Sequence, residues 1–181
     1  MFDWFFNLFG KKKQQEEEEI KIDRDVHDLE VGYILDYNLE SWEVLASYTY
    51  RYKGHMAKEY KIRSSGETRF LNVSDSNSLL LSISKEANMN NIDPSLRSSV
   101  LGQNPLARIN WQGVAYSLKE SSKGQFTDDR LQDWASFSSW EYVDAANEKF
   151  IYVSRWEDGS VECFVGDYIK EFQISNILAS T

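Results

Sequence analysis

The side chains best suited to chemistry are few in this chain and lie far apart. His27, His55 and Cys163 are its only histidines and its only cysteine, and their spacing matches no zinc motif. Asp128 and Asp129 are adjacent and could pair as acid and base, although neighbouring carboxylates in a polar loop are usually solvated. The sequence therefore predicts no metal site, no bound cofactor and no catalytic residue.

Charge and cysteine content exclude further classes of protein. The net charge of −9 argues against nucleic-acid binding, which requires clustered Lys and Arg to displace counterions from phosphates. A single cysteine cannot form an internal disulfide, which fits a reducing compartment such as the cytoplasm. Val161 and Phe164-Val165 flank Cys163, so we expect a buried thiol with no special reactivity.

The first thirteen residues are the strongest candidates for contact with a partner. On a helix over residues 1–10, large apolar side chains recur at i, i+3, i+4 and i+7, and three lysines follow. The segment is too short to span a bilayer, which needs roughly twenty apolar residues. The predicted membrane- or partner-contacting residues are Phe2, Trp4, Phe5, Phe6, Leu8, Phe9, Lys11, Lys12 and Lys13.

Two interpretations of this amphipathic segment remain open. It could bind a lipid surface or a partner protein, or it could fold back onto its own domain. Residues 11–27 are expected to form a charged tether, because the like charges of Glu16 to Glu19 repel and extend the chain. The same glutamates oppose attraction to an anionic membrane, which favours a protein partner.

A stripe of large side chains runs along the clearest predicted strand, residues 42–52. Strict alternation places six apolar side chains on one face, which predicts a buried sheet face. The tyrosines, with Arg51 and Lys53 nearby, also allow a surface that stacks single-stranded bases, a partner-binding face, or a small-ligand cleft. The six side chains are Trp42, Val44, Ala46, Tyr48, Tyr50 and Tyr52.

An internal repeat predicts how these residues are positioned. An offset of 74 residues separates Leu35 from Ile109 and Trp42 from Tyr116. Glu59-Tyr60 recurs as Glu141-Tyr142 at an offset of 82, and Phe70-Leu71-Asn72-Val73-Ser74 recurs as Phe150-Ile151-Tyr152-Val153-Ser154 at an offset of 80. Self-similarity of this kind predicts a mainly β fold of two tandem antiparallel meanders in a pseudo-symmetric barrel or sandwich.

The predicted body covers residues 28–178. Copy one covers 29–83 and copy two covers 108–168, with a linker over 84–107 that contains a short helix at 94–101. An insertion in copy two falls near 123–134, and a last strand is expected at 174–178.

Several short motifs resemble one bacterial family. They are Val31-Gly32-Tyr33-Ile34-Leu35, Trp42-Glu43-Val44, Glu59-Tyr60-Lys61-Ile62, Trp140-Glu141-Tyr142 and Phe150-Ile151-Tyr152-Val153. Over residues 28–178 the chain is similar to the domain of unknown function 4178 family, although Met56 or Ala57 stands where an aromatic residue is expected. The family has no established reaction, and its genes often adjoin those for membrane-stress proteins and polyamine synthesis. The resemblance therefore implies a membrane-linked accessory role and supplies no catalytic residue.

Two functions follow as hypotheses. The first is a non-catalytic interaction module, held near the inner face of the cytoplasmic membrane by residues 1–13. The alternative is a small-ligand-binding or enzymatic barrel with its site between the two copies. A filled interior would favour the first hypothesis, and an internal cavity lined by convergent polar groups would favour the second.

Overall fold

The computed structural model describes residues 24–75, 78–131 and 133–179, and strands account for most of them. The prediction of a mainly β protein is therefore confirmed. Helical elements are short: η1 (Val26–Asp28), α1 (Met89–Ile92), α2 (Leu96–Leu101) and η2 (Glu171–Gln173). The strands are β1 (Ile34–Tyr37), β2 (Glu40–Tyr52), β3 (His55–Ser64), β4 (Glu67–Asp75), β5 (Leu79–Glu86), β6 (Arg108–Trp111), β7 (Val114–Asp128), β8 (Ala135–Asp144), β9 (Lys149–Trp156), β10 (Val161–Ile169) and β11 (Ile174–Leu178).

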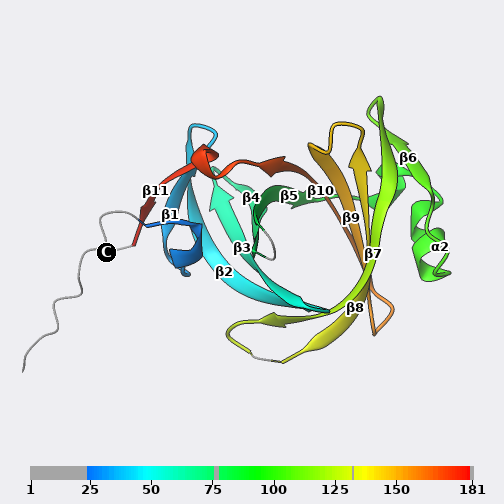
Figure 1. Cartoon of the computed structure of the whole chain (residues 1–181), viewed down its shortest axis with the longest axis horizontal. Helices are drawn as coiled ribbons and strands as arrows, with labels where there is room; N and C mark the ends of the chain where they lie inside the picture. Colours follow the sequence, from blue (N-terminus) through cyan, green and yellow to red (C-terminus); the bar gives the residue numbers. More distant parts are fainter. Residues whose placement is uncertain (1–23, 76–77, 132, 180–181) are drawn as a thin grey trace, which may run out of the picture.

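All of these strands belong to one antiparallel sheet. Its order is β11-β1-β2-β3-β4-β5-β10-β9-β8-β7-β6, and an additional pairing joins β2 to β7. That pairing closes a ring of eight strands, with β1, β11 and β6 paired outside it (Figure 1). A single sheet thus curls round on itself, in place of the two facing sheets of a sandwich.

Two β-bulges bend the strands that close the ring. In β2 the register with β3 shifts between Val44 and Ala46, and in β7 the register with β8 shifts between Leu118 and Glu120. A bulge increases the local twist of a strand and reverses which side chains face each side of the sheet. Beyond its bulge, β2 leaves β1 and pairs with β7.

The bulge in β2 corrects the predicted aromatic stripe. Trp42 and Val44 precede the bulge and pack in a hydrophobic core with Leu35. Tyr50 and Tyr52 follow it and line the interior of the ring. The expectation of one continuous face is therefore wrong, because the alternation changes side in the middle of the strand.

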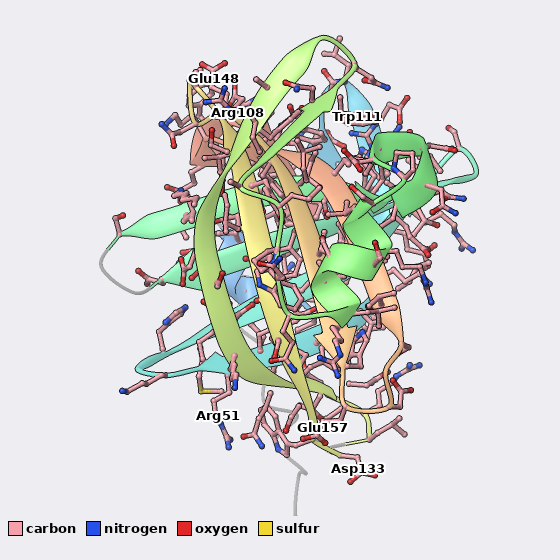
Figure 2. All side chains as sticks on the ribbon, turned by 90° about the vertical axis from the view of Figure 1, so that its right-hand side faces the viewer. Arg51, Arg108, Trp111, Asp133, Glu148 and Glu157 are labelled. Atoms are coloured by element: carbon pink, nitrogen blue, oxygen red, sulfur yellow. The ribbon has the colours of Figure 1, made fainter. Side chains whose placement is uncertain are left out.

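The two hydrophobic cores lie on the outside of the ring. The first, around Leu71 and Ile83, is covered by η1, β1 and β11, and includes Val26 from the segment predicted as a tether. The second, around Ile151 and Val153, is covered by α1, α2 and β6. Figure 2 looks onto this second side, where α2 lies across the ring. Cys163 is buried there, as predicted.

The remaining predicted elements show one clear error. The linker helix is present as α2, which Gly102 ends at its C-cap, and the last strand is β11. However, the first half of the predicted insertion, residues 123–128, continues β7. It pairs with β8 on one side and with β2 on the other, so it closes the ring.

Candidate functional site in the ring interior

The ring encloses a cavity of about 200 Å³, which we call the ring cavity. All eight strands of the ring contribute to its wall, so no single segment of the sequence forms it. Carboxyl, hydroxyl and aromatic side chains predominate in the wall. The lining residues are Tyr50, Tyr52, His55, Ala57, Glu59, Asn72, Ser74, Leu80, Ser82, Ser84, Glu120, Ser122, Phe137, Ser139, Glu141, Phe150, Tyr152, Ser154, Trp156, Phe164 and Tyr168.

Glu59 is the most perturbed carboxyl group in the wall. It lies in the middle of β3 and faces inward, while its neighbour Tyr60 packs in the outer core. Its Oε1 accepts a hydrogen bond from Oη of Tyr50 at 3.0 Å. Burial raises the pKa of Glu59 to about 7, against the lowering effect of the Tyr50 bond. At neutral pH this group can therefore hold or release a proton.

Phenol groups surround this carboxyl group. Oη of Tyr52 and Oη of Tyr152 are 3.2 Å apart and form a hydrogen bond. Burial raises the pKa of Tyr152 to about 12, and the charges of Glu59 and Glu141 act in the same direction. Burial also raises the pKa of Tyr52. These phenols thus stay protonated and can donate hydrogen bonds at physiological pH.

A second carboxyl group faces the cavity from β8. Glu141 lies in the middle of β8, pairs with Glu120 and Tyr152 across the sheet, and accepts a short hydrogen bond from Tyr168. Glu59 and Glu141 are the two glutamates that recur at an offset of 82 in the sequence. Each half therefore contributes one inward-facing glutamate with a tyrosine donor.

Sequence reasoning did not identify these two glutamates as site residues. The Glu-Tyr repeat predicts repeated strands, but it also carries a second signal. The overlooked signal is that a repeated charged residue alternates with a buried aromatic residue within one strand. In such a strand the aromatic faces the core, so the glutamate must face the opposite side of the sheet.

Aromatic rings form much of the remaining wall. Phe137 makes edge-to-face contacts with Tyr50 and Tyr52, with ring centres 5.7 and 5.8 Å apart. Gly124 makes room for this ring, because a Cβ there would approach Cζ of Phe137 at 2.7 Å. Phe137 is thereby fixed against the tyrosines, at the contact between β7 and β8.

The two histidines occupy different environments. His27 is exposed in η1. His55 is the first residue of β3, and its ring stacks on that of Tyr52 with centres 5.0 Å apart. It lines the ring cavity. In the part of the chain that the structure describes, no group of three or more His, Cys, Asp or Glu could hold a metal ion.

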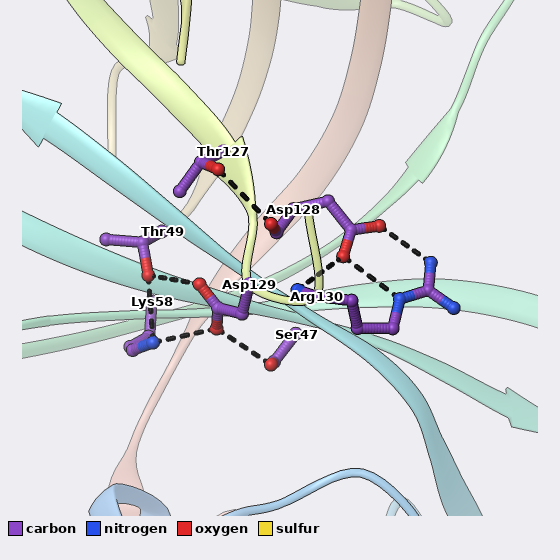
Figure 3. Close-up of polar contacts among 7 residues, drawn as sticks. All are labelled: Ser47, Thr49, Lys58, Thr127, Asp128, Asp129 and Arg130. Carbon is purple, nitrogen blue, oxygen red and sulfur yellow. Dashed lines mark hydrogen bonds and ion pairs between the residues drawn. The ribbon is translucent and has the colours of Figure 1, made fainter. Parts of the chain in front are cut away.

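Asp128 and Asp129 are held in ion pairs at the end of β7 (Figure 3). Asp129 accepts hydrogen bonds from Ser47, Thr49 and Lys58, each at 2.6–2.8 Å. Burial raises the pKa of Asp129, but these bonds outweigh it and the net shift is downward. Asp128 pairs with Arg130, whose hydrogen bonds lower its pKa to about 2. Both groups are therefore ionised, and Asp129 fastens the end of β7 to β2 and β3.

The contact residues predicted at the N-terminus, Phe2 to Lys13, lie outside the described residues. Within residues 24–75, 78–131 and 133–179, the structure contains no helix that is both long and apolar enough to cross a membrane.

Comparison with known proteins gives a family but no activity. The chain is 25% identical over 179 residues to an uncharacterized protein of Aquifex aeolicus (strain VF5), and the match covers 94% of each chain. No solved structure matches the chain significantly. The family model named Domain of unknown function (DUF4178) matches residues 30–171. As its repeated motifs indicated, the chain belongs to this DUF4178 family.

Proposed function

We propose that this protein binds a small organic molecule in the ring cavity and does not transform it. One observation carries the proposal: carboxyl and phenol groups from both halves converge on an internal space of about 200 Å³. Burying polar groups without hydrogen-bond partners costs free energy, so polar groups that surround an internal space indicate that a ligand supplies partners there. An internal cavity lined by convergent polar groups is the feature that favours the alternative hypothesis, a small-ligand-binding barrel.

The position of the hydrophobic cores supports the same conclusion. Both hydrophobic cores lie outside the ring, so much of the apolar burial that stabilises the fold does not depend on filling the ring cavity. The volume lies below the roughly 300–1,000 Å³ that is usual for drug-sized ligands. A compact molecule of a few heavy atoms therefore fits better than a lipid or a peptide.

A variant with a filled cavity tests the proposal. Ser82 lies on β5, faces the cavity and is half-buried, so Ser82→Phe would occupy much of the space. Ser175→Phe makes the same change at an exposed position of β11 and serves as the matched control. We expect compounds from a small-metabolite library to raise the melting temperature of the wild type and of Ser175→Phe, but not of Ser82→Phe. A library without any such compound would refute the proposal.

We also propose that the two halves are related copies. Support comes from the mirrored strand order, with β1 to β5 on one side and β6 to β10 on the other. The two bulges are 74 residues apart, the offset that also separates Trp42 from Tyr116. Superposition of residues 29–83 on residues 108–168 should place Trp42 on Tyr116 and Phe70 on Phe150. Unrelated positions for these pairs would overturn the duplication.

The N-terminal pattern favours a further proposal about location. Residues 1–13 attach the cytoplasmic ligand-binding body to a partner protein or to the membrane surface, since the spacing of their apolar residues would place them on one face of a helix. The protein would then act as an accessory module that senses a small molecule beside that partner.

A further inference from the structure

The chemistry of the ring cavity selects among classes of ligand. Three glutamates line it, Glu59, Glu120 and Glu141, and no Lys or Arg is among the described residues of its wall. None of the three forms an ion pair within the described ranges. The wall therefore attracts positive charge and repels anions such as phosphates and carboxylates.

Each central glutamate also has one oxygen without a partner. Tyr50 donates to Oε1 of Glu59, and Tyr168 donates to Oε1 of Glu141. In the part of the chain that the structure describes, Oε2 of either residue accepts no hydrogen bond. Both side chains border the cavity, so these oxygens are available to a donor inside it. Charge-assisted donors such as ammonium groups form the strongest hydrogen bonds with carboxylates.

The aromatic wall suits the same kind of ligand. Ammonium groups are attracted to the faces of Tyr, Phe and Trp rings, and alkyl carbons pack well against them. Tyr168 already shows this property, because Nζ of Lys119 lies 5.3 Å from the centre of its ring. Lys119 is the bulged residue of β7 and is not part of the cavity wall, so its charge does not occupy the space between the glutamates.

We infer that the ring cavity binds a small alkylammonium ion. Its nitrogen would be held by Oε2 of Glu59 or of Glu141, and its carbons would lie between Tyr52, Phe137 and Tyr152. One glutamate comes from each half, so an ion with an ammonium group at both ends could engage both. This inference names the ligand of the proposed binding function and rests on that function.

Four probes of similar length and different charge test the inference. Butylammonium and 1,4-diaminobutane carry one and two positive charges, 1,4-butanediol is neutral, and butyrate is negative. Binding is measured by titration calorimetry and by melting temperature. We expect both amines to bind and the other two probes to fail. Glu59→Gln with Glu141→Gln should weaken amine binding by about tenfold or more, since each lost charge-assisted hydrogen bond is worth at least about 1.5 kcal/mol.

Two control variants separate the cavity from the acidic surface. Glu40→Gln removes one exposed carboxylate at the start of β2 and should leave amine binding unchanged. Ser82→Phe should abolish it. Amine binding that persists in Ser82→Phe or in the double glutamine variant would show surface attraction only and would overturn the inference.

The remaining outcomes distinguish the two proposals. If butyrate or 1,4-butanediol binds the wild type but not Ser82→Phe, the ring cavity is a ligand site and the cation inference is wrong. If no probe binds, the cation inference also fails, while the library screen with Ser82→Phe still decides the binding function.

Discussion

Replacing Glu59 by Gln should change how the stability of this protein depends on pH. Gln has nearly the same shape, and its side-chain oxygen can still accept the hydrogen bond from Tyr50. It cannot ionise, however. The substitution therefore removes only the cost of placing a negative charge in the ring cavity, where burial raises the pKa of Glu59 from 4.5 to about 7.

The direction of the effect follows from proton binding. Between about pH 4.5 and pH 7, folded Glu59 keeps its proton while unfolded Glu59 has lost it. The raised pKa thus stabilises the fold at low pH, and this contribution is lost as the pH rises through the folded pKa. At about 1.4 kcal/mol for each pH unit, the difference between 4.5 and about 7 corresponds to about 3 kcal/mol.

Urea unfolding of the wild type and of Glu59→Gln, from about pH 5 to about pH 8, measures this difference. The free energy of unfolding of the variant should exceed that of the wild type by an amount that grows to about 3 kcal/mol by the upper end of this range. Glu40→Gln, at an exposed position, should follow the wild type. A constant difference between Glu59→Gln and the wild type at all pH values would show that Glu59 ionises normally and refute our description of the cavity.

Three further changes have defined outcomes. Phe150→Ala should lower the free energy of unfolding, measured by urea unfolding, by about 3 kcal/mol because Phe150 is 7% exposed. Phe70 is only partly buried, so Phe70→Ala should lower the free energy of unfolding by about half as much in the same assay. Gly166→Ala should cost at least about 1 kcal/mol in the same assay, since the new Cβ would approach a backbone oxygen of β5 at 2.3 Å, and a neutral result would contradict that contact. Phe5→Ser with Phe6→Ser should release the protein from membranes or its partner in co-sedimentation without lowering the melting temperature. A lower melting temperature with unchanged sedimentation would place this segment in the core.

The strands could be predicted from the sequence, but the face of the sheet on which each side chain lies could not. Residues 42–52 alternate without interruption, and nothing in their composition marks Leu45 as the extra residue of a bulge. A single such residue transfers every following side chain to the other face. Tyr50 and Tyr52, which the alternation predicts for the core, therefore line a cavity, and no pattern within β2 alone could have shown this.

The closure of the ring was hidden for a different reason. Residues 123–128 have no counterpart at the matching offset in the first half, so the repeat predicts an insertion there and not a strand that closes the ring. Their role depends on pairing with Tyr48 to Tyr52, far away in the chain. Long-range pairing of this kind leaves no local signature beyond the alternation of Ser122, Gly124 and Phe126 on one face.

The outer face of the ring carries the hydrophobic cores, and the inner face forms the proposed binding site. On the outer face, Leu71, Ile83, Ile151 and Val153 are at most 5% exposed, and the flanking elements cover them. This burial stabilises the sheet by roughly 25 cal/mol for each Å² of apolar surface removed from water. Because the outer cores supply much of this burial, Glu59 can stay in the middle of a strand despite its desolvation. Substitutions that retune the cavity, such as Glu59→Gln, should therefore change ligand choice while the outer cores keep the fold intact.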